Sequence, residues 1–161
     1  MTRKNYGKQF EARFREDFKK SFPGSFIMRL ADSTSGYYGA SRNPCDFICL
    51  VDGALHLVEV KCHYGNTFPL SCLRQYDLLD AYSKCDGVKA EVVIWFIDHE
   101  KVVLAPIESL RRIKEAGGKS VNARDFAGWG ISEVPSRRLR TFLTSDYSEV
   151  MRNHGHDADQ H

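Results

Sequence analysis

Apolar and polar positions alternate most regularly in the middle of the chain. Two apolar runs, residues 45–51 and 54–61, flank the dipeptide Asp52-Gly53. An Asp-Gly dipeptide between two strand-like runs is a strong local signal for a β-hairpin, because a type I′ turn needs positive φ at both central positions. The pattern therefore predicts a hairpin in which Val51 pairs with Ala54 and the pairing continues outward from there.

The predicted register places two carboxylates opposite each other. Asp46 faces Glu59, and like charges at a Cβ separation of roughly 5 Å repel unless something compensates. A divalent cation is the usual compensation, and Lys61 supplies a further positive charge two residues beyond Glu59. An alternative is a solvated strand face, or a β-bulge that shifts the register by one residue. Because side chains alternate, one face should carry Asp46, Ile48, Leu50, Leu55, Leu57, Glu59 and Lys61.

Periodicity elsewhere predicts helices and strands around this hairpin. Aromatic residues recur every fourth position within residues 5–22, which indicates an amphipathic helix. The other predicted elements are helices at 71–84 and 107–116, strands at 25–31, 90–97 and 101–105, and a polar loop at 32–43. We expect one α/β domain over residues 1–143, with helices on both faces of a mixed sheet. Residues 144–161 are expected to form a disordered polar tail.

Composition narrows the class of protein without identifying it. The chain has 161 residues, 42% of them hydrophobic and 27% charged, which is ordinary for a globular domain. A net charge of +2 excludes a polybasic, histone-like binder, although basic residues gather near the N-terminus and in the last third. With no apolar run of membrane length and no signal peptide, we expect no membrane partner and a cytoplasmic location.

Cysteine and histidine spacing gives only weak signals for a zinc site. The five cysteines form no C-x-x-C pair, so free thiols in a reducing compartment are expected. Cys62, His63 and Cys72 match no common zinc spacing. The three C-terminal histidines are better explained as part of a solvated tail than as a metal cluster; they are His154, His156 and His161.

Asp46 followed by Glu59-x-Lys61, after a helix that bears Glu11, resembles the PD-(D/E)xK nuclease superfamily. Within it the chain is most similar to the RecU-type Holliday junction resolvases. The closer similarity lies in residues 7–11 (GKQFE), residues 55–70, Gln75, Asp86-Gly87 and Gly118-Lys119-Ser120. The chain departs from that family between the first strand and Asp46, where it has about a dozen residues (32–43) instead of a longer insertion.

The resemblance implies a restriction-endonuclease-like core that binds Mg²⁺, with Mn²⁺ as a substitute. The implied metal ligands are Asp46, Glu59 and the carbonyl of Val60. The implied catalytic residue is Lys61, and Glu11 and Gln75 would place the attacking water or the scissile phosphate. Aromatic residues beside an arginine in a loop can stack on nucleic acid or simply pack the loop. The candidate DNA-binding residues are Lys8, Tyr37, Tyr38, Arg42, Thr67 and Lys119.

The expected activity is Mg²⁺-dependent hydrolysis of DNA phosphodiester bonds, most specifically at four-way junctions during recombination or repair. Two symmetric cuts in a junction imply a homodimer acting on branched or duplex DNA. The alternatives are a restriction-like or structure-nonspecific endonuclease, a non-catalytic DNA-binding modulator of recombination, and a metal-free structural domain. The short segment at 32–43 weighs against junction selectivity more than against nuclease chemistry.

Overall fold

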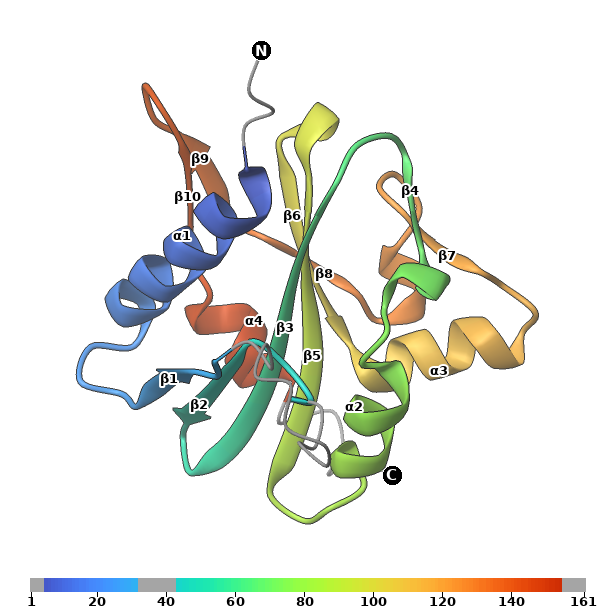
Figure 1. The fold of residues 1–161 in the computed structure, drawn as a ribbon. Helices are drawn as coiled ribbons and strands as arrows, with labels where there is room; N and C mark the ends of the chain where they lie inside the picture. The colour runs from blue at the N-terminus through green and yellow to red at the C-terminus, as the bar shows by residue number, and fades with distance from the viewer. Residues whose placement is uncertain (1–4, 32–42, 155–161) are drawn as a thin grey trace.

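A six-stranded mixed sheet forms the centre of the molecule in the computed structural model, which describes residues 5–31 and 43–154 (Figure 1). The strand order is β1-β2-β3-β5-β6-β8. Strands β3 and β5 run parallel, and the other neighbouring pairs are antiparallel. The strands are β1 (Ile27–Arg29), β2 (Phe47–Val51), β3 (Ala54–His63), β5 (Val88–Phe96), β6 (Lys101–Pro106) and β8 (Ser132–Val134).

The β2–β3 hairpin has the predicted register. Val51 pairs with Ala54, and the ladder continues to the pair Phe47–Val58. Asp52 and Gly53 have φ values of 49° and 82°, as a type I′ turn requires. The ladder ends at Phe47, and the Asp46 N–H donates to the Val58 carbonyl at 3.1 Å. The hairpin prediction is therefore confirmed, with Asp46 just outside the regular pairs.

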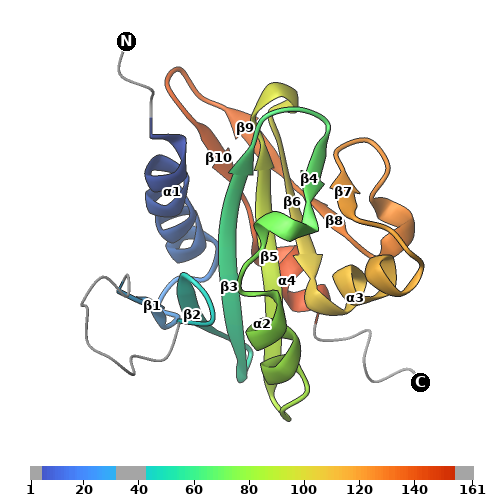
Figure 2. The ribbon, with the colours of Figure 1, turned by 45° about the vertical axis from the view of Figure 1, so that its right-hand side comes forward.

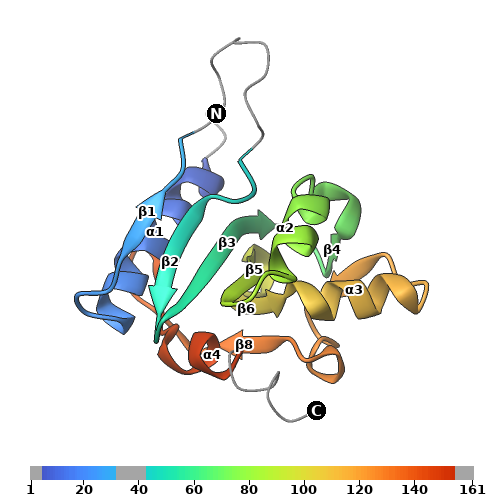
Figure 3. The same cartoon turned by 90° about the horizontal axis from the view of Figure 1, so that it is seen from below.

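Two helices cover each face of the sheet. Helices α1 (Tyr6–Ser21) and α4 (Ser148–Asn153) pack on one face, and α2 (Tyr76–Ser83) and α3 (Ile107–Glu115) pack on the other (Figures 2 and 3). The side chain of Asn5 accepts a hydrogen bond from the Lys8 N–H at 3.2 Å and thereby caps α1. In the part of the chain that the structure describes, no helix is long and apolar enough to cross a membrane.

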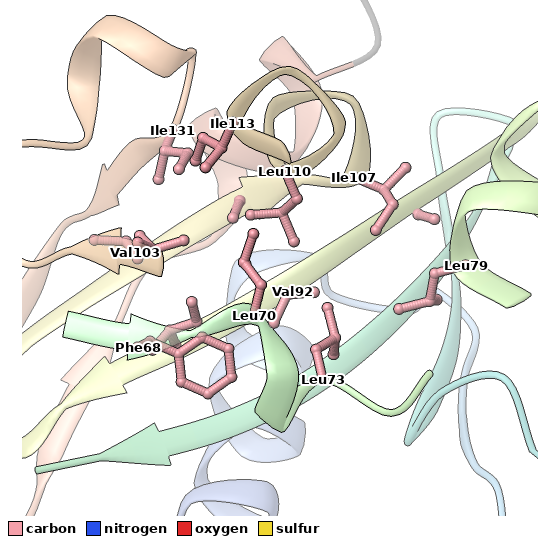
Figure 4. Packing of buried hydrophobic residues seen from close by; sticks show 14 of the residues in the cluster. Phe68, Leu70, Leu73, Leu79, Val92, Val103, Ile107, Leu110, Ile113 and Ile131 are labelled. Carbon is pink, nitrogen blue, oxygen red and sulfur yellow. The ribbon is translucent and has the colours of Figure 1, made fainter. Parts of the chain in front are cut away.

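Alternation along the strands produces two separate hydrophobic cores. Leu57 and Val92 point toward α2 and α3, whereas Val58 and Val93 point toward α1 and α4, because successive side chains leave a strand on opposite faces. Figure 4 shows the first core, in which Phe68, Leu70, Leu73, Leu79, Leu110 and Ile113 pack together. The aromatic stripe of α1 belongs to the second core, and its members Phe14 and Phe18 are fully buried.

Smaller elements flank the main sheet. Strand β4 (Thr67–Pro69) pairs with β7 (Ser120–Asn122), and β9 (Ser136–Arg138) pairs with β10 (Leu143–Ser145). Three short 3₁₀ helices, η1 (Leu70–Cys72), η2 (Ile97–His99) and η3 (Ala127–Trp129), complete the described chain.

The helix expected at residues 71–84 begins later than the sequence predicts. The Leu73 N–H donates to the Leu70 carbonyl, and the Tyr76 N–H donates to the Leu73 carbonyl. These three-residue turns replace regular α-helical hydrogen bonds, because Leu73 is drawn into the core with only 4% of its surface exposed. As a result Gln75 lies at the N-terminal boundary of α2 instead of inside a helical turn.

The expectation of a disordered tail from residue 144 is wrong for residues 144–154, while residues 155–161 lie outside the described part of the chain. The segment 144–154 contains most of β10 and all of α4. Tyr147 and Met151 are fully buried against the sheet and α1. The buried carboxylate of Asp17 accepts hydrogen bonds from the Thr144 hydroxyl at 2.8 Å and from the Ser145 N–H at 2.9 Å. Contacts with the first helix therefore hold a segment whose composition alone suggests disorder.

Candidate active site

Asp46 and Glu59 lie side by side at the open end of the hairpin. The Val60 N–H donates to Asp46 Oδ2 at 2.8 Å, which fixes the aspartate against β3. Glu59 is 2% exposed and belongs to the same strand face as Leu57. The hairpin register thus brings together two carboxyl groups thirteen residues apart in the sequence.

Burial and a like charge make the protonated form of Glu59 favourable. Burial and the nearby charge of Asp46 disfavour the charged form of Glu59, and they raise its pKa to about 8. Lys61 favours the charged form and reduces the size of this shift. Lys61 Nζ lies 3.2 Å from Glu59 Oε1. The other oxygen, Oε2, is buried and has no hydrogen-bond partner among the described residues. An orphaned carboxylate oxygen beside a second carboxylate matches the donor set that Mg²⁺ prefers.

Cys45 places a buried, uncharged thiol beside the two carboxyl groups. Burial, together with the charge of Glu59, raises the pKa of its thiol to about 12, since both disfavour the thiolate. The Cys45 Sγ donates to the Phe47 carbonyl at 3.2 Å. A neutral thiol is a poor ligand for Mg²⁺. Cys45 therefore contributes to the packing of the first core and not to metal binding.

Gln75 lies on the same side of the sheet as Glu59. Its neighbours in sequence, Leu73 and Leu79, pack with Leu57 in the first core. The amide oxygen Oε1 of Gln75 is buried and has no hydrogen-bond partner within the described ranges. This oxygen lies on the same side of the sheet as the Glu59 carboxyl group.

Glu11 is engaged elsewhere in this structure. Its Oε2 accepts from Arg29 Nε at 3.0 Å and lies 2.9 Å from Arg29 Nη2. Among the described residues it makes no hydrogen bond or ion pair with Asp46 or Glu59. Helix α1 covers the opposite face of the sheet, so Glu11 reaches the sheet edge through Arg29, whose register partner is Phe47.

The candidate DNA-binding residues fall into three groups. Lys8 is exposed on α1, beside a surface hollow that Glu11 also lines. Thr67 and Lys119 are exposed at opposite ends of the β4–β7 pair, because Thr67 pairs with Asn122 and Lys119 precedes Ser120, the partner of Pro69. The Lys119 carbonyl accepts from the Leu70 N–H at 2.9 Å. Tyr37, Tyr38 and Arg42 lie outside the described residues.

A second cluster of titratable side chains was missed from the sequence. His56 of β3, Glu91 of β5 and His154 at the end of α4 meet in the interior, with all three ligand atoms within 4.8 Å of one another. Glu91 is the only charged residue in the apolar run at 90–97, and a lone charge in a buried strand is the signal that could have identified it. His154 was assigned to the tail instead.

No protein-family model matches the chain, and neither does any curated protein. Among solved structures it is similar to Hjc, described as a Holliday junction resolvase from the archaeal hyperthermophile Archaeoglobus fulgidus. The sequence identity is 17%, the TM-score is 0.56, and the match covers 91% of this chain and 98% of that one.

The chain therefore has an α/β, restriction-endonuclease-like fold with a central mixed sheet and helices on both faces. This confirms the predicted fold class. The similarity concerns the fold, and the closer resemblance to RecU-type enzymes stays a prediction from sequence motifs.

Proposed function

We propose that this protein is a metal-dependent DNA endonuclease that uses the Asp46–Glu59–Lys61 site. The observation that carries the proposal is the placement of two carboxyl groups side by side, where the buried Glu59 adjoins Asp46 and Lys61 Nζ lies 3.2 Å from Glu59 Oε1. A purely structural core would be expected to avoid two adjacent carboxyl groups with so little exposed surface, because burying a charge beside a like charge is unfavourable. The similarity of the fold to a nuclease supports phosphodiester hydrolysis as the chemistry of this site.

Each residue of the site has a defined part in the proposed reaction. Asp46, Glu59 and the Val60 carbonyl would hold Mg²⁺, or Mn²⁺ in its place, as a set of hard oxygen ligands. When bound, the ion would polarise the phosphodiester and help to activate a water molecule. Lys61 would orient or deprotonate the attacking water and stabilise negative charge that develops on the phosphate oxygens. The expected products carry a 5′-phosphate and a 3′-hydroxyl.

Gln75 and Glu11 would have secondary parts. The free amide oxygen of Gln75 can accept a hydrogen bond from the attacking water, which would orient it. Glu11 would act through Arg29, its partner in this structure, to position the strand end that carries Asp46.

The surface beside α1 suits a DNA backbone. An open hollow of about 540 Å³ is lined by four basic and two acidic residues of α1 and β1. Basic side chains in such a hollow favour contact with phosphates. The residues are Lys8, Arg15, Lys19, Arg29, Glu11 and Glu16.

We propose four-way DNA junctions as the preferred substrate, with branched or duplex DNA as the wider class. A homodimer would supply the two symmetric cuts that resolve a junction. A cytoplasmic location and a role in recombination or repair accompany this proposal. The supporting observations are the similarity of fold to a protein described as a Holliday junction resolvase and the sequence motifs that resemble RecU-type enzymes.

The decisive experiment is cleavage of a synthetic mobile four-way junction next to a linear duplex of matched sequence. Each substrate is incubated with Mg²⁺, with Mn²⁺ and with EDTA. We expect paired symmetric nicks in the junction, abolished by EDTA and reduced about a hundredfold or more by Asp46→Asn or Lys61→Ala. Lys84→Ala is the matched surface control, because Lys84 is exposed and pairs with Asp80 of α2.

The other outcomes distinguish the remaining functions. Equal cutting of junction and duplex would indicate a structure-nonspecific endonuclease, which the short segment at 32–43 favours. Absence of cutting in both metals, with tight junction binding that Asp46→Asn leaves unchanged, would contradict the enzyme proposal and indicate a DNA-binding protein. Circular dichroism of each variant separates loss of chemistry from loss of folding.

A further inference from the structure

Three side chains from distant parts of the chain converge on the face of the sheet that α4 covers. His56 Nδ1 lies 2.5 Å from Glu91 Oε1, and His154 Nδ1 lies 2.6 Å from Glu91 Oε2. Each oxygen of the carboxylate therefore faces a different imidazole nitrogen. The partners of Glu91 are 35 and 63 residues away in the sequence.

The cluster is buried more completely than an ordinary surface ion pair. The side chains of Glu91 and His56 are 0% and 2% exposed, and that of His154 is 8% exposed. A buried carboxylate that stays ionised requires positive charge beside it.

A second carboxylate contacts the other ring nitrogen of His154. Glu108, in the first turn of α3, has its Oε2 3.2 Å from His154 Nε2. Metal-binding histidines commonly use one ring nitrogen for the ion and donate the other N–H to a carboxylate. Two carboxylates, two neutral imidazoles and one dication would sum to zero charge, which suits a buried position.

The cluster is accessible from solvent on one side. A surface hollow of about 200 Å³ is lined by His154 and Glu108, together with Lys89, Arg112 and Asn153. An ion can reach the imidazole of His154 through this hollow, and a water molecule can complete its coordination.

We propose that His56, Glu91 and His154 form a binding site for a first-row transition-metal dication, with Zn²⁺ as the best match. Two imidazoles and one carboxylate are a typical ligand set for Zn²⁺, with a fourth position left for water. Glu108 is the positioning residue that orients His154. The bound ion would cross-link the end of α4 to the two central strands, β3 and β5.

Binding of the ion requires a small movement of the two imidazole rings. Ligand atoms about 2.1 Å from Zn²⁺ in a tetrahedral site stand roughly 3.4 Å apart. The imidazole nitrogens must therefore draw back by about 1 Å from their present positions beside Glu91. The hollow beside His154 leaves room for this shift on one side.

This site is independent of the proposed nuclease site. Glu59 shares its strand face with Leu57 of the first core, whereas His56 shares the opposite face with Val58 of the second core, as expected where the strand side chains alternate. The histidine-containing ligand set suits Zn²⁺, and the all-oxygen set at Asp46 and Glu59 suits Mg²⁺. Either proposal can therefore fail without the other.

The test uses the full chain, stripped with chelator, desalted and titrated with Zn²⁺ by calorimetry. A parallel titration with Co²⁺ reports imidazole ligation by visible absorption, and a melting curve reports stabilisation by Zn²⁺. We expect one tight Zn²⁺ per chain. We expect Glu91→Gln and His154→Gln each to lower the affinity by about tenfold or more, and Glu108→Gln to lower it about tenfold.

Matched controls separate the cluster from other histidines and from the nuclease site. His99→Ala removes an imidazole of η2, and His156→Ala with His161→Ala removes two near the C-terminus. Asp46→Asn removes a ligand of the proposed Mg²⁺ site. All these controls should keep the tight site and the Co²⁺ spectrum.

Two results would overturn the proposal. One is wild-type protein that shows neither tight Zn²⁺ binding nor a Co²⁺ absorption band. The other is tight binding that folded Glu91→Gln or His154→Gln retains in full. Either result would identify the cluster as a protonated imidazole–carboxylate network that holds α4 in place without a metal.

Discussion

At the scale of single residues, Glu59 favours its protonated form at neutral pH when no metal ion lies beside it. Its pKa is raised to about 8 because burial and the charge of Asp46 both disfavour ionisation. Lys61 reduces this effect without reversing it. A divalent cation between the two carboxylates would therefore have to displace a proton from Glu59, so ion binding at this site should release acid.

The raised pKa of Glu59 gives a stability prediction for the chelated protein. The folded-state pKa of about 8 exceeds the ordinary value of 4.5, so the folded state holds a proton that the unfolded state releases between these values. This contribution to stability is fully present below about pH 4.5 and is lost as the pH rises through about 8. Between pH 5 and pH 9 the wild type should lose more stability than Glu59→Gln.

Urea unfolding in EDTA at pH 5, 7 and 9 measures this difference. Glu133→Gln, at an exposed position of β8, is the control and should follow the wild type. If wild type and Glu59→Gln have parallel pH profiles, the inferred pKa of Glu59 is wrong.

At the scale of elements, α4 is the part whose stability is least evident from composition. Its six residues are too few to form an isolated helix, and packing must stabilise it. Met151 is fully buried in the second core, whereas Asn153 on the same helix is exposed.

We therefore expect Met151→Ala to destabilise the protein by about 2–5 kcal/mol, as for other large-to-small changes in a core. Asn153→Ala should change stability by less than about 0.5 kcal/mol. Denaturant midpoints with unchanged slopes would provide the comparison. An equally small effect of both changes would mean that α4 does not pack on the sheet in solution.

The hairpin could be predicted because its signals are local. The turn dipeptide and the alternation together determine the register, and the register brings Asp46, Glu59 and Lys61 together. The surroundings of Gln75 and Glu11 were harder to predict, because tertiary packing decides which face of a helix is buried and which side chains its residues contact. Glu11 meets Arg29, and this contact has no signature in the sequence around either residue.

The buried histidine cluster and α4 could not be predicted for a related reason. Their stabilising partners lie far away in the chain, so a local window contains only polar residues with a few apolar ones. His154 follows a short helix whose apolar positions are obscured by neighbouring charges. Its partner Glu91 is in a strand that was correctly identified, although the need of that carboxylate for a partner was not recognised.

At the scale of the whole molecule, binding and chemistry should be separable. The hollow beside α1 and the β4–β7 pair provide exposed basic residues outside the carboxylate site, among them Lys8 and Lys119. Each lysine that contacts a phosphate releases a counterion, which makes affinity depend on salt.

We expect Lys8→Ala and Lys119→Ala each to weaken DNA binding and to reduce the slope of log affinity against log salt by about 1. Fluorescence anisotropy with a labelled junction in Ca²⁺ or EDTA would measure this at several salt concentrations. Lys84→Ala should leave both quantities unchanged. A slope that is the same in all three variants would place the DNA elsewhere on the surface.

The carboxylate of Asp17 connects the first helix to a strand 127 residues later in the chain. During synthesis, α1 leaves the ribosome long before Thr144 and Ser145 exist, so the Asp17 carboxylate has Arg13 of the same helix beside it but still lacks these two donors. Non-local contacts of this kind slow folding, because the intervening chain must first be ordered. The nascent protein should therefore stay loosely packed until Met151 has emerged, and only then reach its native form.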